Sequence, residues 1–182
     1  KLREAAQRDA RVAALADGRT GLAVDFGAAP GGWTEYLSDQ GLGAVAIDPG
    51  AVDAKIAQRP NVATLRMDVA ESLESGALDA AARALGKGDH VRALVCDMNC
   101  HVDISLRLLG DLAAHLGEGR RRGCVVVLTV KLVHRGHNAW LKLEHEVLAK
   151  LKAMGVQDHR CYHLLSNRRH EKTIIGSFPA WG

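Results

Sequence analysis

Aromatic side chains are scarce in this 182-residue chain: Phe, Trp and Tyr together make up 4% of it. Hydrophobic residues nevertheless account for 47%, so the apolar content comes mainly from Ala, Val and Leu. Charged residues account for 25%, which is typical of one globular domain with a sizeable core. This composition excludes a disordered or collagen-like chain, and it favours helices packed on a buried sheet over an aromatic-rich β-sandwich.

Long hydrophobic runs are also missing. The longest one extends from Cys124 to Leu128, whereas a membrane-spanning helix needs about 20 apolar residues. The chain starts at Lys1 without a Met, and it lacks the apolar segment and small-residue cleavage site of a signal peptide. We therefore expect no membrane association, and we expect a further region upstream of Lys1 in the natural protein.

Cysteine is infrequent and has no regular spacing. The four cysteines are Cys96, Cys100, Cys124 and Cys161. Free cysteine often behaves as a small buried hydrophobe, so we expect reduced thiols and a cytoplasmic or mitochondrial location. The Cys-x-x-x-Cys-His arrangement at residues 96–101 lacks the paired Cys-x-x-Cys of structural zinc sites, and no metal is expected. The net charge of +3 permits a polyanionic partner without requiring one.

Apolar runs of strand type alternate with helical segments along the chain. The expected strands are 22–26, 44–47, 62–65, 91–96, 124–130, 160–165 and 173–176. The expected helices are 2–15, 33–39, 51–57, 72–85, 104–116 and 138–154. Such alternation indicates a mostly parallel sheet with helices on both faces. The last two strands are joined by a segment too short for a parallel crossover, so the last strand should be antiparallel. We expect a single α/β domain over residues 1–182.

A glycine-rich loop follows the first expected strand. Residues 27–32 read Gly-Ala-Ala-Pro-Gly-Gly, between a strand that carries Asp25 and a helix that begins near Trp33. Glycines permit close backbone approach, and a helix N-terminus offers unpaired N–H groups to an anionic part of a ligand. The dinucleotide fingerprint Gly-x-Gly-x-x-Gly is broken because Ala29 stands in place of its second glycine. This departure disfavours an NAD site.

Acidic residues end three successive strands: Asp25, Asp48 and Asp68. Ligands of doubly wound sheets bind beyond the carboxyl ends of such strands. Asp48 is placed to accept hydrogen bonds from a ribose diol, and Asp68 suits the amine of an adenine, although either residue could instead cap a turn or a helix. Since the glycine-rich loop carries no phosphate-binding lysine, the pattern favours a nucleoside cofactor without phosphates, S-adenosylmethionine.

Residues 25–34, Asp-Phe-Gly-Ala-Ala-Pro-Gly-Gly-Trp-Thr, closely resemble motif I of the FtsJ/RrmJ-like ribose 2′-O-methyltransferases. The resemblance continues through residues 95–98, 130–132 and 166–173, so it covers nearly the whole chain. It implies a Rossmann-like methyltransferase fold with a seven-stranded sheet, S-adenosylmethionine as cofactor, and RNA as substrate. The pattern is most similar to members that modify bacterial large-subunit ribosomal RNA, which carry an additional N-terminal RNA-binding region.

Members of this family use a Lys-Asp-Lys-Glu tetrad, and the resemblance assigns each position. Asp97 follows the fourth strand, Lys131 follows the fifth, and Glu171 precedes the last. Lys1 opens the Lys-Leu-x-Glu-Ala pattern of the N-terminal helix, although the Ser-Arg element expected before it is absent from this chain. The expected cofactor site comprises Asp25, Gly27, Ala29, Pro30, Gly31, Gly32, Trp33, Asp48, Asp68 and Asp97.

The chemistry gives each tetrad position a reason. Methyl transfer to a hydroxyl is an in-line displacement that needs alignment of the reactants and removal of a proton. A second lysine and a dry pocket disfavour the charged form of Lys131, which then serves as general base, or else its cation steers the hydroxyl. Asp97 and Glu171 would orient the two lysines, and no metal is required.

Basic side chains should surround the same strand ends: Arg135, Arg168 and Arg169 are the expected RNA contacts. Phosphate contacts of this type give affinity and position without reading sequence. The expected partner is ribosomal RNA or a pre-ribosomal particle.

Three other functions remain open. An RNA cap 2′-O-methyltransferase would have a similar tetrad, but the few aromatic residues offer no candidate cap-guanine pocket. A catalytically idle ribosome assembly factor could use the same fold to bind RNA or protein. An NAD-dependent oxidoreductase is weakened by the missing glycine. The modified nucleotide and the oligomeric state are left open.

Overall fold

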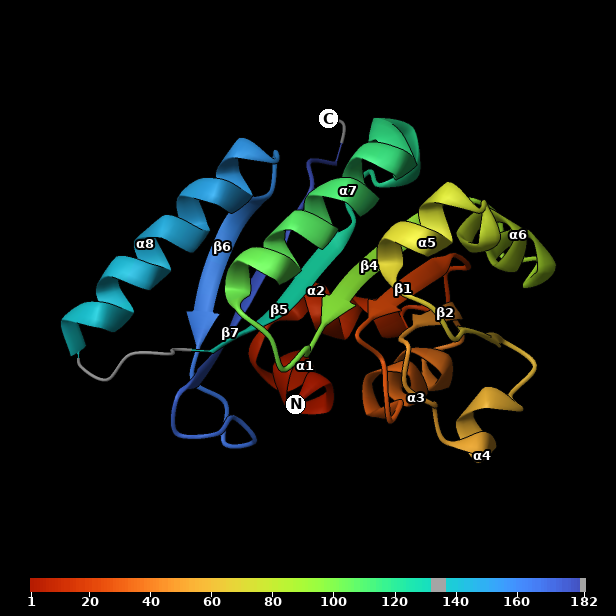
Figure 1. The fold of residues 1–182 in the computed structure, drawn as a ribbon, viewed down its shortest axis with the longest axis horizontal. Coiled ribbons are helices and arrows are strands. Elements are labelled where there is room, and N and C mark those ends of the chain that lie inside the picture. Colours follow the sequence, from red (N-terminus) through yellow and green to blue (C-terminus); the bar gives the residue numbers. More distant parts are fainter. Residues whose placement is uncertain (132–136, 181–182) are drawn as a thin grey trace.

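The computed structural model describes residues 1–131 and 137–180. At the centre of this part of the chain lies a seven-stranded sheet with the strand order β3-β2-β1-β4-β5-β7-β6 (Figure 1). The strands are β1 (Leu22–Phe26), β2 (Gly43–Ile47), β3 (Val62–Leu65), β4 (Val91–Cys96), β5 (Val125–Lys131), β6 (Gln157–Tyr162) and β7 (Glu171–Ser177). The first five strands pair in parallel, whereas β7 is antiparallel to both β5 and β6. The expected mostly parallel sheet with an antiparallel last strand is confirmed.

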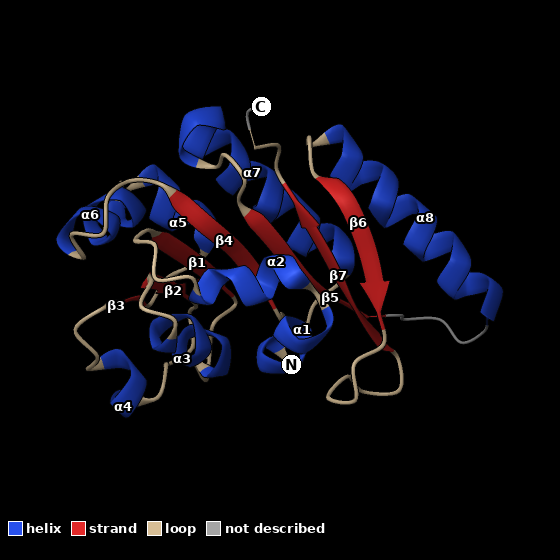
Figure 2. Ribbon diagram, turned by 180° about the vertical axis from the view of Figure 1, so that it is seen from behind, coloured by secondary structure: helices blue, strands red, loops and turns tan. Residues whose placement is uncertain are grey.

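Helices cover both faces of the sheet (Figure 2). They are α1 (Leu2–Arg8), α2 (Ala10–Ala13), α3 (Gly32–Asp39), α4 (Ala54–Ala57), α5 (Val69–Glu74), α6 (Ala77–Ala84), α7 (Val102–Arg120) and α8 (His137–Ala153), with a 3₁₀ turn η1 (Ala14–Ala16). Helices α5 to α8 lie on one face, and α1 to α3 lie on the other (Figure 1). Among the described residues, no helix combines the length and apolar character needed to span a membrane.

Alternation along the strands divides the core into two layers. In β1, Leu22, Val24 and Phe26 are buried in the layer beneath α5 to α8, whereas Ala23 belongs to the layer beneath α1 to α3. This is the period-two pattern of a strand that is covered on both faces. Alanines on the second face leave room for the larger Trp33 and Leu37 of α3.

Two of the predicted helices are wrong in extent because each is interrupted. The expected helix 2–15 breaks at Asp9, whose backbone is extended and whose carboxylate caps α2 by accepting from the Arg11 N–H. The expected helix 72–85 is two helices, because Gly76 at φ +73° separates α5 from α6. Both interruptions use residue types that favour caps and left-handed backbone.

Other boundaries differ by a few residues. β6 begins at Gln157 instead of the expected residue 160. α4 begins at Ala54 instead of residue 51, since Asp53 accepts from the Lys55 N–H as its N-cap. The four cysteines are free thiols, as expected.

The topology brings distant residues to one edge of the sheet. The carboxyl ends of β1, β2, β4 and β5 meet there, and the antiparallel register of β7 places Glu171 directly opposite Lys131. Ligand sites of open α/β sheets form at this edge.

Candidate active site

Lys1 lies between two carboxylates at this edge of the sheet. Its Nζ is 2.9 and 3.1 Å from the two carboxylate oxygens of Asp97, and 2.7 Å from Oε2 of Glu171. Lys1 is the N-cap of α1, Asp97 directly follows β4, and Glu171 begins β7. Three elements from the two ends and the middle of the chain therefore meet in one ion-pair cluster.

Lys131 completes the cluster from the end of β5. Its Nζ lies 3.6 Å from Oε1 of Glu171, the oxygen that Lys1 does not contact, and it donates to Oδ1 of Asn99 at 3.0 Å. Glu171 is thus held between two lysines, with its side chain only 4% exposed. The structure brings together all four residues of the predicted tetrad.

The ion pairs determine the charge states in this cluster. Burial disfavours the charge on Lys1, but the hydrogen bonds to Glu171 and Asp97 outweigh it and raise the pKa of Lys1 above its ordinary value. Burial acts against ionisation of Glu171 as well. The hydrogen bonds that it accepts from Lys1 and from the Arg168 N–H nevertheless lower the pKa of Glu171. Lys1 is therefore a fixed cation at neutral pH, which makes it an orienting group and unsuited to be the base.

Glu4 fastens the β6–β7 loop to α1, one helical turn after Lys1. Its Oε1 accepts from the Leu165 N–H at 2.6 Å, and its Oε2 accepts from the N–H and hydroxyl of Ser166 at 3.0 and 2.6 Å. These hydrogen bonds, that of the Ser166 hydroxyl first, lower the pKa of Glu4 to about 2. Lys1 is the N-cap of α1, and the β6–β7 loop leads into Glu171. By joining α1 to this loop, the Glu4 carboxylate therefore helps to position both residues of the Lys1–Glu171 ion pair.

The glycine-rich loop packs closely against the residue that follows Asp97. Gly27 has φ +83°, and a Cβ at this position would lie 1.9 Å from Cγ of Met98. Gly31 has φ +115°, and a Cβ there would lie 2.8 Å from Val52. Gly32 differs from both, since a Cβ on it would meet nothing within 4 Å. Two glycines are therefore required by the fold, and the third borders open space.

Acidic side chains converge beneath this loop. Asp25 is 1% exposed and accepts from the Thr34 hydroxyl at 2.6 Å. Burial, assisted by the charges of Asp97 and Asp48 and opposed by the Thr34 hydrogen bonds, raises the pKa of Asp25 to about 7. Asp48 accepts from the N–H groups of Ala29 and Gly50, so it ties the loop to the end of β2.

The remaining predicted cofactor residues differ in their surroundings. Asp68 is exposed and caps α5 by accepting from the Glu71 N–H at 2.8 Å, which is the capping role considered above. Trp33 is 8% exposed and packs in the core layer of α3. Pro30 is exposed, and Ala29 is half-buried. A cavity of about 140 Å³ lies beside Asp48 between the ends of β2 and β3.

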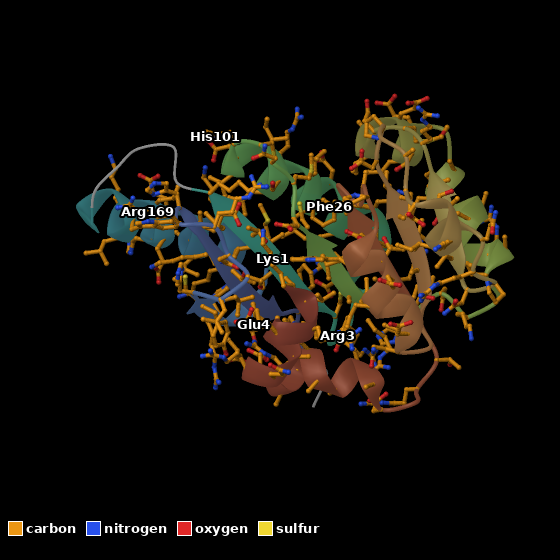
Figure 3. All side chains as sticks on the ribbon, turned by 90° about the horizontal axis from the view of Figure 1, so that it is seen from below. Lys1, Arg3, Glu4, Phe26, His101 and Arg169 are labelled. Carbon is orange, nitrogen blue, oxygen red and sulfur yellow. The ribbon has the colours of Figure 1, made fainter. Side chains whose placement is uncertain are left out.

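Basic residues of the β6–β7 loop lie next to the tetrad. Arg168 and Arg169 are exposed, and the backbone N–H of Arg168 donates to Glu171 at 3.0 Å. In Figure 3, Lys1 lies near the centre of this side of the molecule, with Glu4 on the same helix and Arg169 toward α8. The predicted RNA contact Arg135 lies outside the described residues. Among the described residues, no group of three or more His, Cys, Asp or Glu is placed to hold a metal ion.

A larger cavity, of about 610 Å³, lies at the opposite edge of the sheet, near His90 and Phe178. Three of its arginines already have acidic partners, since Arg11 pairs with Asp9 and both Arg19 and Arg92 pair with Asp17. It lacks the lysine and acid cluster of the other edge, so we place the active site at the tetrad.

Sequence reasoning missed Asn99, Glu4 and Thr34 as parts of this site. Thr34 lies within the glycine-rich motif, and its position on the first turn of α3 is the signal that could have identified it. Glu4 is the glutamate of the Lys-Leu-x-Glu-Ala pattern, which is the signal that could have identified it, whereas Asn99 had only its proximity in sequence to Asp97. Their contacts depend on the fold.

Comparison with known proteins shows the family of this chain. The model of the FtsJ-like methyltransferase family matches residues 1–152, and the chain belongs to this family. The chain is similar to ribosomal RNA large subunit methyltransferase M of Laribacter hongkongensis, with 31% identity over 161 residues. The matched region is 87% of this chain but 40% of that relative, so the chain spans less than half of its length.

Solved structures share the fold. One is the 1,6-didemethyltoxoflavin-N1-methyltransferase of Burkholderia thailandensis with bound S-adenosylhomocysteine, at a TM-score of 0.60 and 20% identity over 97% of this chain and 79% of that one. Another is the fibrillarin of Aeropyrum pernix with natively bound S-adenosylmethionine, at a TM-score of 0.57 and 13% identity over 85% of this chain and 65% of that one. At these identities, the likeness shows a common methyltransferase fold.

Proposed function

We propose that this chain is the catalytic domain of an S-adenosylmethionine-dependent methyltransferase that acts on a ribose 2′-hydroxyl of ribosomal RNA. The observation that carries the proposal is the cluster of Lys1, Asp97, Lys131 and Glu171 beside the glycine-rich loop. Family membership favours methyl transfer over the hydride transfer of an oxidoreductase. The similarity to a large-subunit ribosomal RNA methyltransferase supports the substrate class.

The residues at the strand ends fit S-adenosylmethionine. The open space at Gly32 lets a ligand approach the loop backbone, and the first N–H groups of α3 face the same edge. Asp48 lies beside a cavity at the end of β2, where it can accept from ribose hydroxyls. The partly exposed carboxylate of Asp97 can face the electropositive methyl-sulfonium end of this cofactor, whereas Asp25 is buried against the Thr34 hydroxyl and supports the loop from beneath. When bound, S-adenosylmethionine supplies an electrophilic methyl group.

The tetrad then has three tasks. Lys1 stays charged and neutralises Asp97 and Glu171. Glu171 holds both lysines through its two oxygens. The Lys131 side chain is 18% exposed, and in its neutral form the amine can bind the attacking hydroxyl and accept its proton. General base catalysis by such a positioned group contributes about 10²- to 10⁴-fold.

The β6–β7 loop supplies the RNA contact. It presents Arg168 and Arg169 to solvent directly before Glu171. Contacts of arginine with phosphates position a nucleic acid without specifying its sequence. Because the chain spans 40% of the relative's length, we assign the choice of nucleotide to regions outside this domain.

The first test is calorimetric titration with S-adenosylmethionine. We expect saturable binding to the wild type, a large loss in Asp48→Ala, and no change in Asp111→Ala, an exposed acid on α7. The second test is transfer of labelled methyl to unmodified large-subunit ribosomal RNA, with the 2′-O-methyl nucleoside identified by mass spectrometry. Binding without transfer to ribosomal RNA or to ribosomal particles would favour the idle assembly factor. Methylation of a cap structure instead would favour a cap methyltransferase.

A further inference from the structure

Lys131 is held by an amide in addition to the acid of the tetrad. Its Nζ donates to Oδ1 of Asn99 at 3.0 Å, which is a full hydrogen bond. The nearer oxygen of Glu171 is 3.6 Å away, outside good hydrogen-bond distance. Among the described residues, Asn99 therefore supplies the closest side-chain oxygen to Lys131 Nζ.

Partners other than Lys131 set the position of the Glu171 carboxylate. Its Oε2 already accepts from Lys1 Nζ at 2.7 Å and from the Arg168 N–H at 3.0 Å. These two donors draw Glu171 toward α1 and its own loop. The position of Lys131 Nζ then depends on Asn99, which lies two residues after Asp97 on the segment between β4 and α7.

The neutrality of this amide matters for the chemistry. A carboxylate at hydrogen-bond distance would favour the charged ammonium strongly, whereas an amide oxygen favours it less. The other charged groups of the cluster are Glu171 on β7, Lys1 on α1 and Asp97 after β4. A neutral acceptor fixes Nζ without adding a third carboxylate to this set.

We propose that Asn99 is a positioning residue that orients Lys131 Nζ toward the attacking ribose hydroxyl through a neutral acceptor. This inference rests on the proposed function for the reaction, and on the Asn99–Lys131 contact for the geometry. Asn99 acts through Lys131 and has no reacting atom of its own.

The test compares Asn99→Asp and Asn99→Ala with His101→Asp. The Asp variant keeps the shape of Asn99 but places a negative charge beside Nζ. His101 is exposed and caps α7, a role that Asp also performs, so this control adds a carboxylate nearby without replacing the acceptor of Lys131. Methyl transfer to unmodified large-subunit ribosomal RNA is measured across pH 6 to 10, together with the affinity for S-adenosylmethionine.

In Asn99→Asp, we expect the pH of half-maximal activity to rise by about one unit or more, because a close opposite charge favours the ammonium. At pH 7 the rate then falls about tenfold. In Asn99→Ala, the half-maximal pH falls and the maximal rate also falls, since Nζ is no longer held. Cofactor affinity stays unchanged in both variants, and His101→Asp keeps the wild-type profile. A purely structural role for Asn99 would not shift the profile in opposite directions.

A second readout needs no RNA. The Nζ resonance of Lys131 is followed by NMR through a pH titration of lysine-labelled protein, with Lys131→Arg for assignment. The titration midpoint of Lys131 should be highest in Asn99→Asp, intermediate in the wild type and lowest in Asn99→Ala. Equal midpoints in the three proteins would overturn the inference. The expected order combined with no methyl transfer by the wild type would instead overturn the proposed function and leave the positioning contact established.

Discussion

Nζ of Lys1 lies 2.7 Å from Oε2 of Glu171, although the two residues are 170 positions apart in the chain. The contact joins the N-cap of α1 to the first residue of β7. Side-chain exposures of 14% for Lys1 and 4% for Glu171 make this ion pair poorly screened by water. Removal of either charge would leave the other partly buried and unpaired, which would lower the free energy of unfolding. The same ion pair therefore contributes both to the stability of the domain and to the geometry of the proposed active site.

Replacement of Lys1 by Met should reduce both stability and methyl transfer. Glu171 would lose its closest cation, and we expect the free energy of unfolding to fall by about 2 kcal/mol, less than for a fully buried pair because Lys131 remains nearby. Transfer should fall at least about a hundredfold. Urea denaturation and the RNA methylation assay measure the two effects.

The double variant Lys1→Met, Glu171→Gln separates these effects. It removes both charges of this pair but leaves Asp97 without Lys1, so part of the lost stability should return while methyl transfer stays low. Arg3→Met is the matched control on the same helix, since Arg3 is 73% exposed. Wild-type activity in Lys1→Met would show that Lys1 has no part in catalysis.

Asp25 should give the stability of the domain a dependence on pH. Burial raises its pKa from the ordinary 3.8 to about 7. Between these values the unfolded chain has released the proton and the folded chain retains it, so stability falls as pH rises. We expect the free energy of unfolding to drop by about 2 to 3 kcal/mol between pH 5 and 7, and Asp25→Asn to abolish this drop.

Urea denaturation at several pH values measures this slope. His159 acts in the opposite direction, because burial lowers its pKa and the unfolded state binds its proton more readily. Because both proteins contain His159, its contribution cancels when the free energy of unfolding of Asp25→Asn is subtracted from that of the wild type at each pH. Glu171, whose pKa is lowered, affects stability only below its ordinary pKa of 4.5. If the free energy of unfolding depends on pH in the same way in both proteins, Asp25 is ionised in the folded state over this range.

The glycine-rich loop offers a pair of substitutions with opposite expectations. In Gly27→Ala, the new Cβ would overlap Met98 and the backbone has φ +83°, so the domain should be strongly destabilised. In Gly32→Ala, the Cβ meets no protein atom within 4 Å, so stability should stay within about 0.5 kcal/mol of the wild type. Thermal denaturation measures both.

Cofactor binding makes this comparison informative. If the space at Gly32 belongs to S-adenosylmethionine, Gly32→Ala should weaken the calorimetric affinity about tenfold or more without loss of stability. Unchanged affinity would place the cofactor away from this part of the loop.

Features that depend on one segment of the chain could be predicted from the sequence, whereas contacts between distant segments could not. The five parallel strands are short apolar runs, and their positions follow from hydrophobic pattern alone. The breaks at Asp9 and Gly76 were missed because the helical pattern continues across them. The contacts of Glu4 and Asn99 were missed for a different reason. They exist only after the β6–β7 loop and the end of β5 have been brought next to α1 and β4, which is information about the fold and not about any one segment.

Glu4 gives the last prediction, because its carboxylate accepts three hydrogen bonds from the β6–β7 loop. Its pKa of about 2 means that it stays ionised at every pH at which the enzyme would be assayed. In Glu4→Ala, the loop should separate from α1, and kcat should fall about tenfold while the affinity for S-adenosylmethionine stays unchanged. Glu4→Gln should lie between Ala and wild type, since an amide has one acceptor oxygen and adds an N–H donor opposite other donors.

Hydrogen exchange provides a readout at the loop itself. The amide protons of Leu165 and Ser166 donate to Glu4, so their exchange should accelerate in Glu4→Ala and stay slow in Gln7→Ala, an exposed control on the same helix. Because the loop carries Arg168 and ends at Glu171, faster exchange at Leu165 and Ser166 should accompany the fall in kcat. Accelerated exchange with unchanged kcat would show that the loop anchor serves stability alone, and that Glu171 is positioned by Lys1 without help from Glu4.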